Sequence, residues 1–213
     1  MRTTFPLGAN RVRWMHSWRF RAVKENSTPQ HIAFLAETMS FTGDDGSNRS
    51  IPLEQSILDC AQFCFQHETR LVSFFLEKGT PRPRIEGKAA LMEAQVLYLP
   101  NNPPQPTEGD RRILLAIGYS EKETLWQMLR EQRTARVSEE QILKLLCRDG
   151  WVEPDLVILC ANRRELGETL TWSIAYSEIY FSSSPLVGFP MEEMVSVYRD
   201  YANRQRRFGG ILP

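Results

Sequence analysis

The feature that most constrains the fold of this chain is a series of short apolar runs that read as buried strands. The run from Asp155 to Cys160 is DLVILC, and strand-like runs also lie at 31–35, 70–76 and 112–117. A strand that is apolar without alternation is buried on both of its faces, as a central strand of a parallel sheet is. The chain is therefore predicted to build an α/β fold around a mainly parallel sheet.

Helical periodicity fills the intervals between these strands. Residues 52–67 carry an apolar stripe, and Pro52 suits a first helical turn. Further helices are expected over 121–133, from Ser138 onward and over 190–206. The sequence fits helix, strand or both at 89–99, and a helix or a short strand at 169–181. Loops are expected at 42–50 and 101–109.

Composition excludes several classes of protein. The chain has 213 residues, of which 42% are hydrophobic, enough for a normal core. Lys+Arg and Asp+Glu balance at 26 each, so no charge excess predicts binding to nucleic acid. No apolar run approaches the length of a membrane-spanning helix, and no secretory signal is recognisable. We therefore expect a cytoplasmic protein.

The cysteines do not predict a metal site. Cys60 and Cys64 are four residues apart, but neither Cys147 nor Cys160 belongs to a second pair that would complete a zinc set. We expect reduced, buried thiols and no metal bound by this chain.

The first 28 residues are predicted to be an appendage to a domain that spans 29–213. Trp14, Trp18 and Phe20 alternate with basic residues. This pattern fits a basic amphipathic helix at a membrane surface, and it also fits a helix packed on the domain or on a partner. We favour packing, because Trp and Phe anchor protein interfaces as well as lipid ones. Peripheral membrane contact stays an alternative.

The stretch from 155 to 210 resembles the C-terminal third of the cis-prenyltransferases, the undecaprenyl and dehydrodolichyl diphosphate synthases. It reads PDLVILCANRRELGETLTWSIAYSEIYF and, after a spacer, YRDYANRQRRFGG. The family has a similar PDLVIR-T-G-G-E-x-R-x-S segment, then W-Q-x-A-Y-x-E-x-Y-F and a final R-R-F-G-G. Weaker matches extend the resemblance to about 29–210. It implies a six-stranded, largely parallel sheet flanked by helices, and dimers around a tunnel that receives the growing prenyl chain.

Measured against this family, the residues for chemistry are missing. Glu37 replaces the catalytic aspartate of M-D-G-N-G-R-W, and the glycines and arginine of that motif are gone. The two arginines that hold diphosphate align with Leu159 and Glu165, and the serine aligns with Gly167. Replacing Arg by Glu reverses the sign of a phosphate contact. Arg163 and Arg164 stand one or two places away, so compensation by them is an alternative.

The family's C-terminal R-x-G motif is present as Arg207, Phe208 and Gly209, followed by Gly210. In the family this motif reaches across the dimer to help bind isopentenyl diphosphate in the other subunit's site. The accessory subunit of eukaryotic dehydrodolichyl diphosphate synthase similarly combines R-x-G with a degenerate site. On residues alone, this tail is also an ordinary basic helix end followed by glycine.

The resemblance therefore implies a non-catalytic subunit that lends Arg207, Gly209 and Gly210 to a catalytic cis-prenyltransferase partner holding Mg²⁺, with isopentenyl diphosphate shared at the interface. Four further matched residues are assigned to that interface: Trp172, Tyr176, Glu178 and Tyr180. Glu178 is expected to be structural, and the three aromatic residues also fit a plain core position. Two alternatives stay open. One is a homodimeric enzyme that uses Glu37, and the other is an interaction module tethered by the basic N-terminal segment.

Overall fold

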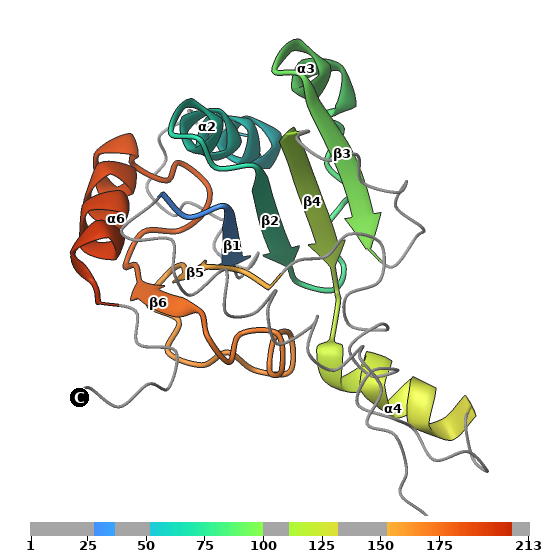
Figure 1. The fold of residues 1–213 in the computed structure, drawn as a ribbon. Coiled ribbons are helices and arrows are strands. Elements are labelled where there is room, and N and C mark those ends of the chain that lie inside the picture. The colour runs from blue at the N-terminus through green and yellow to red at the C-terminus, as the bar shows by residue number, and fades with distance from the viewer. Residues whose placement is uncertain (1–27, 37–51, 100–110, 132–152, 206–213) are drawn as a thin grey trace, which may run out of the picture.

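The computed structural model describes residues 28–36, 52–99, 111–131 and 153–205 (Figure 1). Within these ranges the chain forms one sheet of six parallel strands in the order β3-β4-β2-β1-β5-β6. The strands are β1 His31–Ala36, β2 Leu71–Leu76, β3 Ala94–Leu99, β4 Arg111–Ile117, β5 Leu156–Leu159 and β6 Glu178–Phe181. The predicted α/β class is confirmed, and so is the six-stranded parallel sheet that the resemblance implied.

Four helices are described: α2 Leu53–Gln66, α3 Glu86–Leu91, α4 Glu121–Glu131 and α6 Met191–Asn203. The helix predicted over 52–67 is confirmed, with Pro52 directly before its first residue. The ambiguity at 89–99 resolves into the end of α3 followed by β3. The segment 169–181 is neither a long helix nor a long strand, because only its last four residues form β6. The predicted appendage 1–28, apart from Thr28, the helix from Ser138 and both predicted loops lie outside the described residues.

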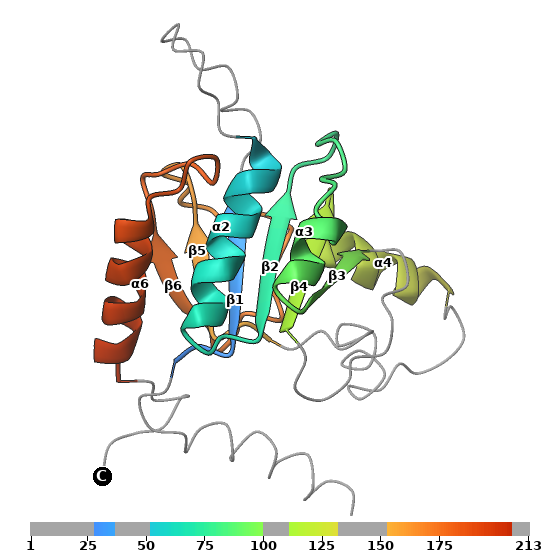
Figure 2. The same ribbon diagram turned by 90° about the horizontal axis from the view of Figure 1, so that it is seen from above.

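The two faces of the sheet are covered differently. On one face, Ile32, Phe34 and Ala36 of β1 pack in a large core with residues of α2 and α6. On the other face, Ala33 and Leu35 belong to a smaller cluster with residues of the segment between β5 and β6. Figure 2 shows α2 and α3 lying across the first face, with α6 beside β6. Successive side chains of β1 point to opposite faces of the sheet, and both faces are buried. The sequence of this strand is therefore apolar throughout and shows no alternation of apolar and polar residues.

The first core also holds buried cysteine side chains. Cys60, Cys64 and Cys160 are free and buried, as the sequence predicted, whereas Cys147 lies outside the described residues. Burial raises the pKa of Cys64 to about 12. Among the described residues, no group of His, Cys, Asp or Glu side chains has the arrangement of a metal site.

Candidate functional site at the carboxyl edge of the sheet

In a parallel sheet, the loops that leave the carboxyl ends of neighbouring strands converge, and ligands commonly bind there. Here that edge is formed by the ends of β1, β2, β4, β5 and β6. Glu37 follows β1 directly but lies outside the described residues, so its geometry is not part of this site. The loops after β2, β4, β5 and β6 are described, and they define what this edge can do.

The loop after β5 has the backbone shape of a glycine motif without the glycines. Ala161 and Asn162 have φ of 58° and 57°, in the left-handed region that disfavours side chains. The peptide N–H groups of Ala161 and Asn162 donate to the carbonyls of Ser184 and Ser182, each at 2.8 Å. These positions align with the two glycines of R-T-G-G-E. Backbone bonds to the loop after β6 therefore hold the turn.

The side chains of this loop differ from those of the family's diphosphate motif. Leu159 is 1% exposed and packs in the apolar cluster with Ala33, Leu35 and Leu170. Glu165 is exposed, and its carbonyl accepts a 2.7 Å hydrogen bond from Nε of Arg163. An apolar side chain and an acidic one thus stand at the two positions where the family motif has arginines.

Arg163 occupies the space that the missing serine would fill. Gly167 has φ of +63°, and a Cβ built on it would lie 3.0 Å from Nη2 of Arg163. The guanidinium of Arg163 therefore lies at Gly167, whereas Arg164 is exposed.

The loops after β2 and β4 are pressed together. Gly118 has φ of +60°, its N–H donates to the carbonyl of Leu76, and a Cβ on it would lie 3.1 Å from Cα of Lys78. After β2, Thr80 closes a turn onto the carbonyl of Glu77, in place of the family's S-x-E-N-W motif. Close packing of Gly118 against the backbone and side chain of Lys78 therefore shapes this part of the edge.

Glu121, the first residue of α4, was missed by sequence reasoning. It is 1% exposed, and its carboxylate accepts hydrogen bonds from the N–H groups of Thr171, Trp172 and Ser173 and from the Thr171 hydroxyl. Burial, reinforced by the nearby Glu121 charge, raises the pKa of Tyr119 to about 12. An acidic residue in a first helical turn is expected for the helix dipole, so nothing in the pattern set Glu121 apart.

The predicted interface residues divide into two groups. The side chains of Trp172 and Tyr176 are 49% and 45% exposed. The alternative prediction that they are core residues is therefore wrong, and both are accessible at the surface. Tyr180 is half-buried and packs against the large core, where partial burial raises its pKa. Phe181 is 59% exposed and adds a further aromatic side chain next to these positions in the sequence.

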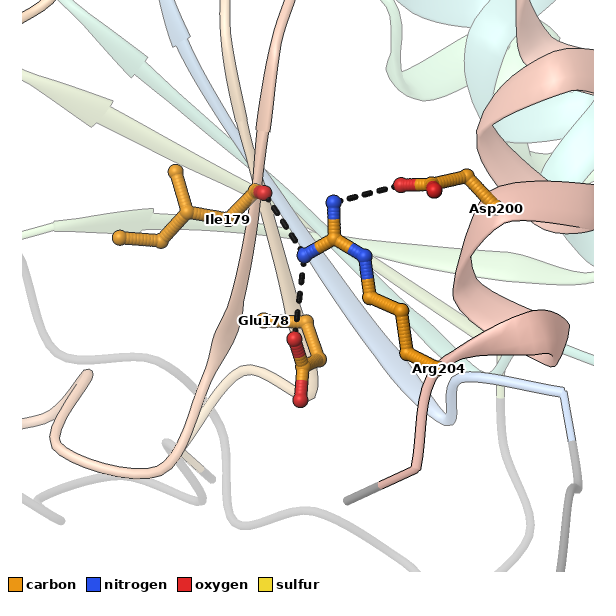
Figure 3. Close-up of polar contacts among 4 residues, drawn as sticks. All are labelled: Glu178, Ile179, Asp200 and Arg204. Atoms are coloured by element: carbon orange, nitrogen blue, oxygen red, sulfur yellow. Dashed lines mark hydrogen bonds and ion pairs between the residues drawn. The ribbon is translucent and has the colours of Figure 1, made fainter.

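Glu178 is tied to the end of α6 (Figure 3). Arg204 Nη1 donates to the Glu178 carboxylate at 3.0 Å and to the Ile179 carbonyl at 2.9 Å, and Nη2 contacts Asp200 at 2.5 Å. Partial burial opposes the charge of Arg204, but the hydrogen bonds to Asp200 and Glu178 outweigh it and raise its pKa. The Glu178 carboxylate therefore belongs to an ion-pair cluster that joins β6 to α6, while its structural role and its place at an interface stay predictions. The Asp200 and Arg204 spacing of four was the available signal for this cluster.

The remaining predicted residues, Arg207, Gly209 and Gly210, lie outside the described residues. Arg204 is the last residue with described contacts before them, and it holds the end of α6 against β6.

Comparison with known proteins agrees with this architecture. Residues 56–209 match the model of the prenyltransferase family described as "Putative undecaprenyl diphosphate synthase". Because the match covers well over half of the sequence, this chain belongs to the cis-prenyltransferase family.

Relatives are similar over part of their length. An isoprenyl transferase of Aquifex aeolicus is 31% identical over 101 residues, which are 46% of this chain and 44% of the relative. An isoprenyl transferase of Listeria innocua is 33% identical over 91 residues, 42% of this chain and 36% of the relative. The aligned part thus spans less than half of the length of these relatives.

Solved structures show the same fold over most of the chain. A probable undecaprenyl diphosphate synthase from Campylobacter jejuni matches with a TM-score of 0.57 and 16% identity, over 85% of this chain and 98% of that one. Lavandulyl diphosphate synthase from Lavandula x intermedia, solved with dimethylallyl diphosphate, matches with a TM-score of 0.59 and the same coverage and identity. None of the described helices combines the length and apolar character that crossing a bilayer requires.

Proposed function

We propose that this chain is a non-catalytic subunit of a heteromeric cis-prenyltransferase, which condenses isopentenyl diphosphate with an allylic diphosphate. One observation carries the proposal. The two positions at the carboxyl edge that should grip diphosphate hold the buried, apolar Leu159 and the exposed, anionic Glu165.

The electrostatics of these positions oppose binding of a polyanion. Two unit charges at about 4 Å interact by roughly 4 kcal/mol at an effective dielectric of 20. Replacing a guanidinium by a carboxylate turns that attraction into repulsion, and solvent exposure of Glu165 reduces the size of the effect without changing its sign. The side chain of Leu159 has no hydrogen-bond donor.

The proposed contribution to catalysis is made in trans. Arg207 offers a fork of donors suited to diphosphate, and Gly209 and Gly210 allow close approach of the backbone. These residues complete the isopentenyl diphosphate site of the catalytic partner. The exposed Trp172 and Tyr176 support a docking surface for that partner, since aromatic side chains dominate interface cores.

Mg²⁺ belongs to the partner's site in this proposal. No cluster of three suitable ligands occurs in the described part of this chain, and Glu37 alone would supply a single carboxylate. The complex is proposed to be cytoplasmic, with residues 1–28 packed on protein or in peripheral contact with a membrane, and to have no role with nucleic acid.

A second candidate, an active homodimer with Glu37 as its carboxylate, is favoured by two observations. The relatives are named isoprenyl transferases. In addition, the Arg163 guanidinium lies at Gly167, which aligns with the serine of the family's diphosphate motif. In this candidate Arg163 would replace one of the lost arginines.

Assays of prenyl transfer from isopentenyl diphosphate to farnesyl diphosphate decide between these candidates. We expect no Mg²⁺-dependent product from the purified chain alone, and product when it is co-purified with a cis-prenyltransferase subunit of the same host. Arg163→Ala should leave the activity of the complex unchanged. Turnover by the chain alone that is abolished by Arg163→Ala and by Glu37→Ala would establish the homodimeric enzyme instead.

The role of the tail is tested in the reconstituted complex. Arg207→Ala should lower kcat/KM for isopentenyl diphosphate roughly ten- to a hundredfold, because a charge-assisted contact is lost. Arg206→Ala is the matched control and should have a much smaller effect. Assembly, followed by size-exclusion chromatography, should be intact in both variants. Equal kinetics for both variants would reduce this chain to a scaffold.

A further inference from the structure

The contacts of Glu121 join two segments that are about fifty residues apart in the sequence. From α4, the N–H groups of Glu121 and Lys122 donate to the carbonyls of Thr169 and Glu168, at 3.3 and 3.4 Å. In return, the Glu121 carboxylate accepts from three consecutive N–H groups, those of Thr171, Trp172 and Ser173. Hydrogen bonds therefore run in both directions between the segments.

Neighbouring side chains reinforce this junction. Ser120 caps α4 by accepting from the Glu123 N–H at 3.1 Å, and its hydroxyl also contacts the Glu168 carbonyl. Lys122 and Glu168 form an ion pair at the surface. Glu121 is the buried member of the group, at 1% exposure.

The segment that Glu121 holds has little regular structure of its own. Residues 171–176 contain only bends and turns. Leu170, just before this segment, and Ile174 within it are buried, and the Ser177 hydroxyl donates to the Pro154 carbonyl at 2.6 Å at the far end. A buried carboxylate that accepts several N–H groups is a strong constraint, because charged hydrogen bonds are about twice as strong as neutral ones. Without it, three backbone donors would lose their acceptor.

We propose that Glu121 is a positioning residue for the exposed Trp172. By fixing the backbone at 171–173, it holds this side chain in the arrangement that meets the catalytic subunit. The conclusion about the backbone stands on the contacts alone, whereas the docking role rests on the proposed function.

Amide hydrogen exchange of the isolated chain tests the backbone role. Glu121→Gln keeps the volume of the side chain but removes its charge, and Glu121→Asp keeps the charge but shortens its reach. In both variants, amides 171–173 should exchange about tenfold faster or more, while the amides of β1 and β2 are unchanged. Glu123→Gln, an exposed acid in the same helical turn, is the control and should behave as wild type. Unchanged exchange at 171–173 would overturn the inference.

Binding to the catalytic subunit tests the docking role. Glu121→Gln should weaken assembly about tenfold, as Trp172→Ala should, and Glu123→Gln should not. Faster exchange with unchanged binding would show that Glu121 only staples the loop, which overturns the positioning role. If the wild-type chain assembles with no cis-prenyltransferase subunit, the proposed function fails, whereas the exchange result still decides the role of Glu121 in the backbone.

Discussion

The loop after β5 and the junction between α6 and β6 present opposite combinations of backbone and side chain. In the loop, Ala161 and Asn162 adopt the left-handed conformations of a glycine motif, but Leu159 and Glu165 supply no phosphate ligand. At the junction, Glu178 and Arg204 form a specific ion pair on ordinary backbone. The comparison teaches that a backbone conformation can be fixed by hydrogen bonds between two loops, independently of the side chains that flank it.

The largest effect on stability is expected when an arginine is put back into the loop after β5. Leu159→Arg should lower the free energy of unfolding by at least about 3 kcal/mol, because a guanidinium would enter an apolar cluster without a partner. Urea denaturation measures the loss. Glu165→Arg, on the exposed side of the same loop, should stay within about 0.5 kcal/mol of wild type. A loss below about 1 kcal/mol for Leu159→Arg would show that this position readily accepts an arginine.

Removing the guanidinium of Arg204 should destabilise the junction between α6 and β6. Arg204→Ala removes hydrogen bonds to two carboxylates and one carbonyl, and the Arg204 side chain is 31% exposed. We expect a loss of about 1–2 kcal/mol in thermal or urea unfolding. Arg199→Ala on the exposed surface of α6 is the control, with an expected change below about 0.5 kcal/mol. Equal effects of the two variants would mean that the cluster is only a surface ion pair.

Alkaline pH should weaken the loop through Cys160. Burial, aided by the charge of Glu193, raises the pKa of this thiol from 9.0 to about 12. The unfolded chain therefore releases the proton first, so stability is full below pH 9 and falls as the pH rises toward 12. Cys160→Ala should remove on the order of 1 kcal/mol of this loss between pH 8 and pH 10. Identical pH profiles for variant and wild type would place Cys160 outside this effect.

The smallest expected effect is a gain. Ala161→Gly should stabilise the chain by roughly 0.5–1 kcal/mol, because relief of the left-handed strain exceeds the added entropy of the unfolded state. Asn162→Gly should gain less, since Asn tolerates this conformation better than Ala. Differential scanning calorimetry resolves both changes. Destabilisation by Ala161→Gly would mean that the Ala161 methyl group contributes packing that outweighs the strain.

The sequence predicted the parts of the fold that depend on local pattern. The strand runs and the helix after Pro52 follow from burial on both faces and from helical periodicity, and the structure confirms them. The secondary structure of residues 89–99 could not be predicted from the sequence, because α3 is only six residues long and β3 lies at the edge of the sheet. The structure of residues 169–177 could not be predicted either, because the carboxylate of Glu121 in α4 binds the backbone at 171–173. A local sequence pattern does not indicate a contact between residues fifty positions apart.

Motif comparison predicted which residues of the candidate site differ from the family, but it gave no geometry. Motif comparison identified Leu159, Glu165 and Gly167, and the structure adds that Arg163 reaches across Gly167. Motif comparison gave no sign that Ala161 and Asn162 adopt left-handed conformations, which glycine tolerates best. Motif comparison reads side-chain identity one position at a time. The conformation of Ala161 and Asn162 depends instead on hydrogen bonds to the carbonyls of Ser182 and Ser184 in the loop after β6.

The strained turn at Ala161 and Asn162 also bears on how readily this protein could be re-engineered. Its shape is maintained by amide–carbonyl bonds to the loop after β6, so exchanging side chains there need not rebuild the backbone. The strain is a reserve of free energy that a glycine at 161 would release. The stability gained in this way could offset the cost of introducing the polar or charged side chains that a new binding site at this edge requires.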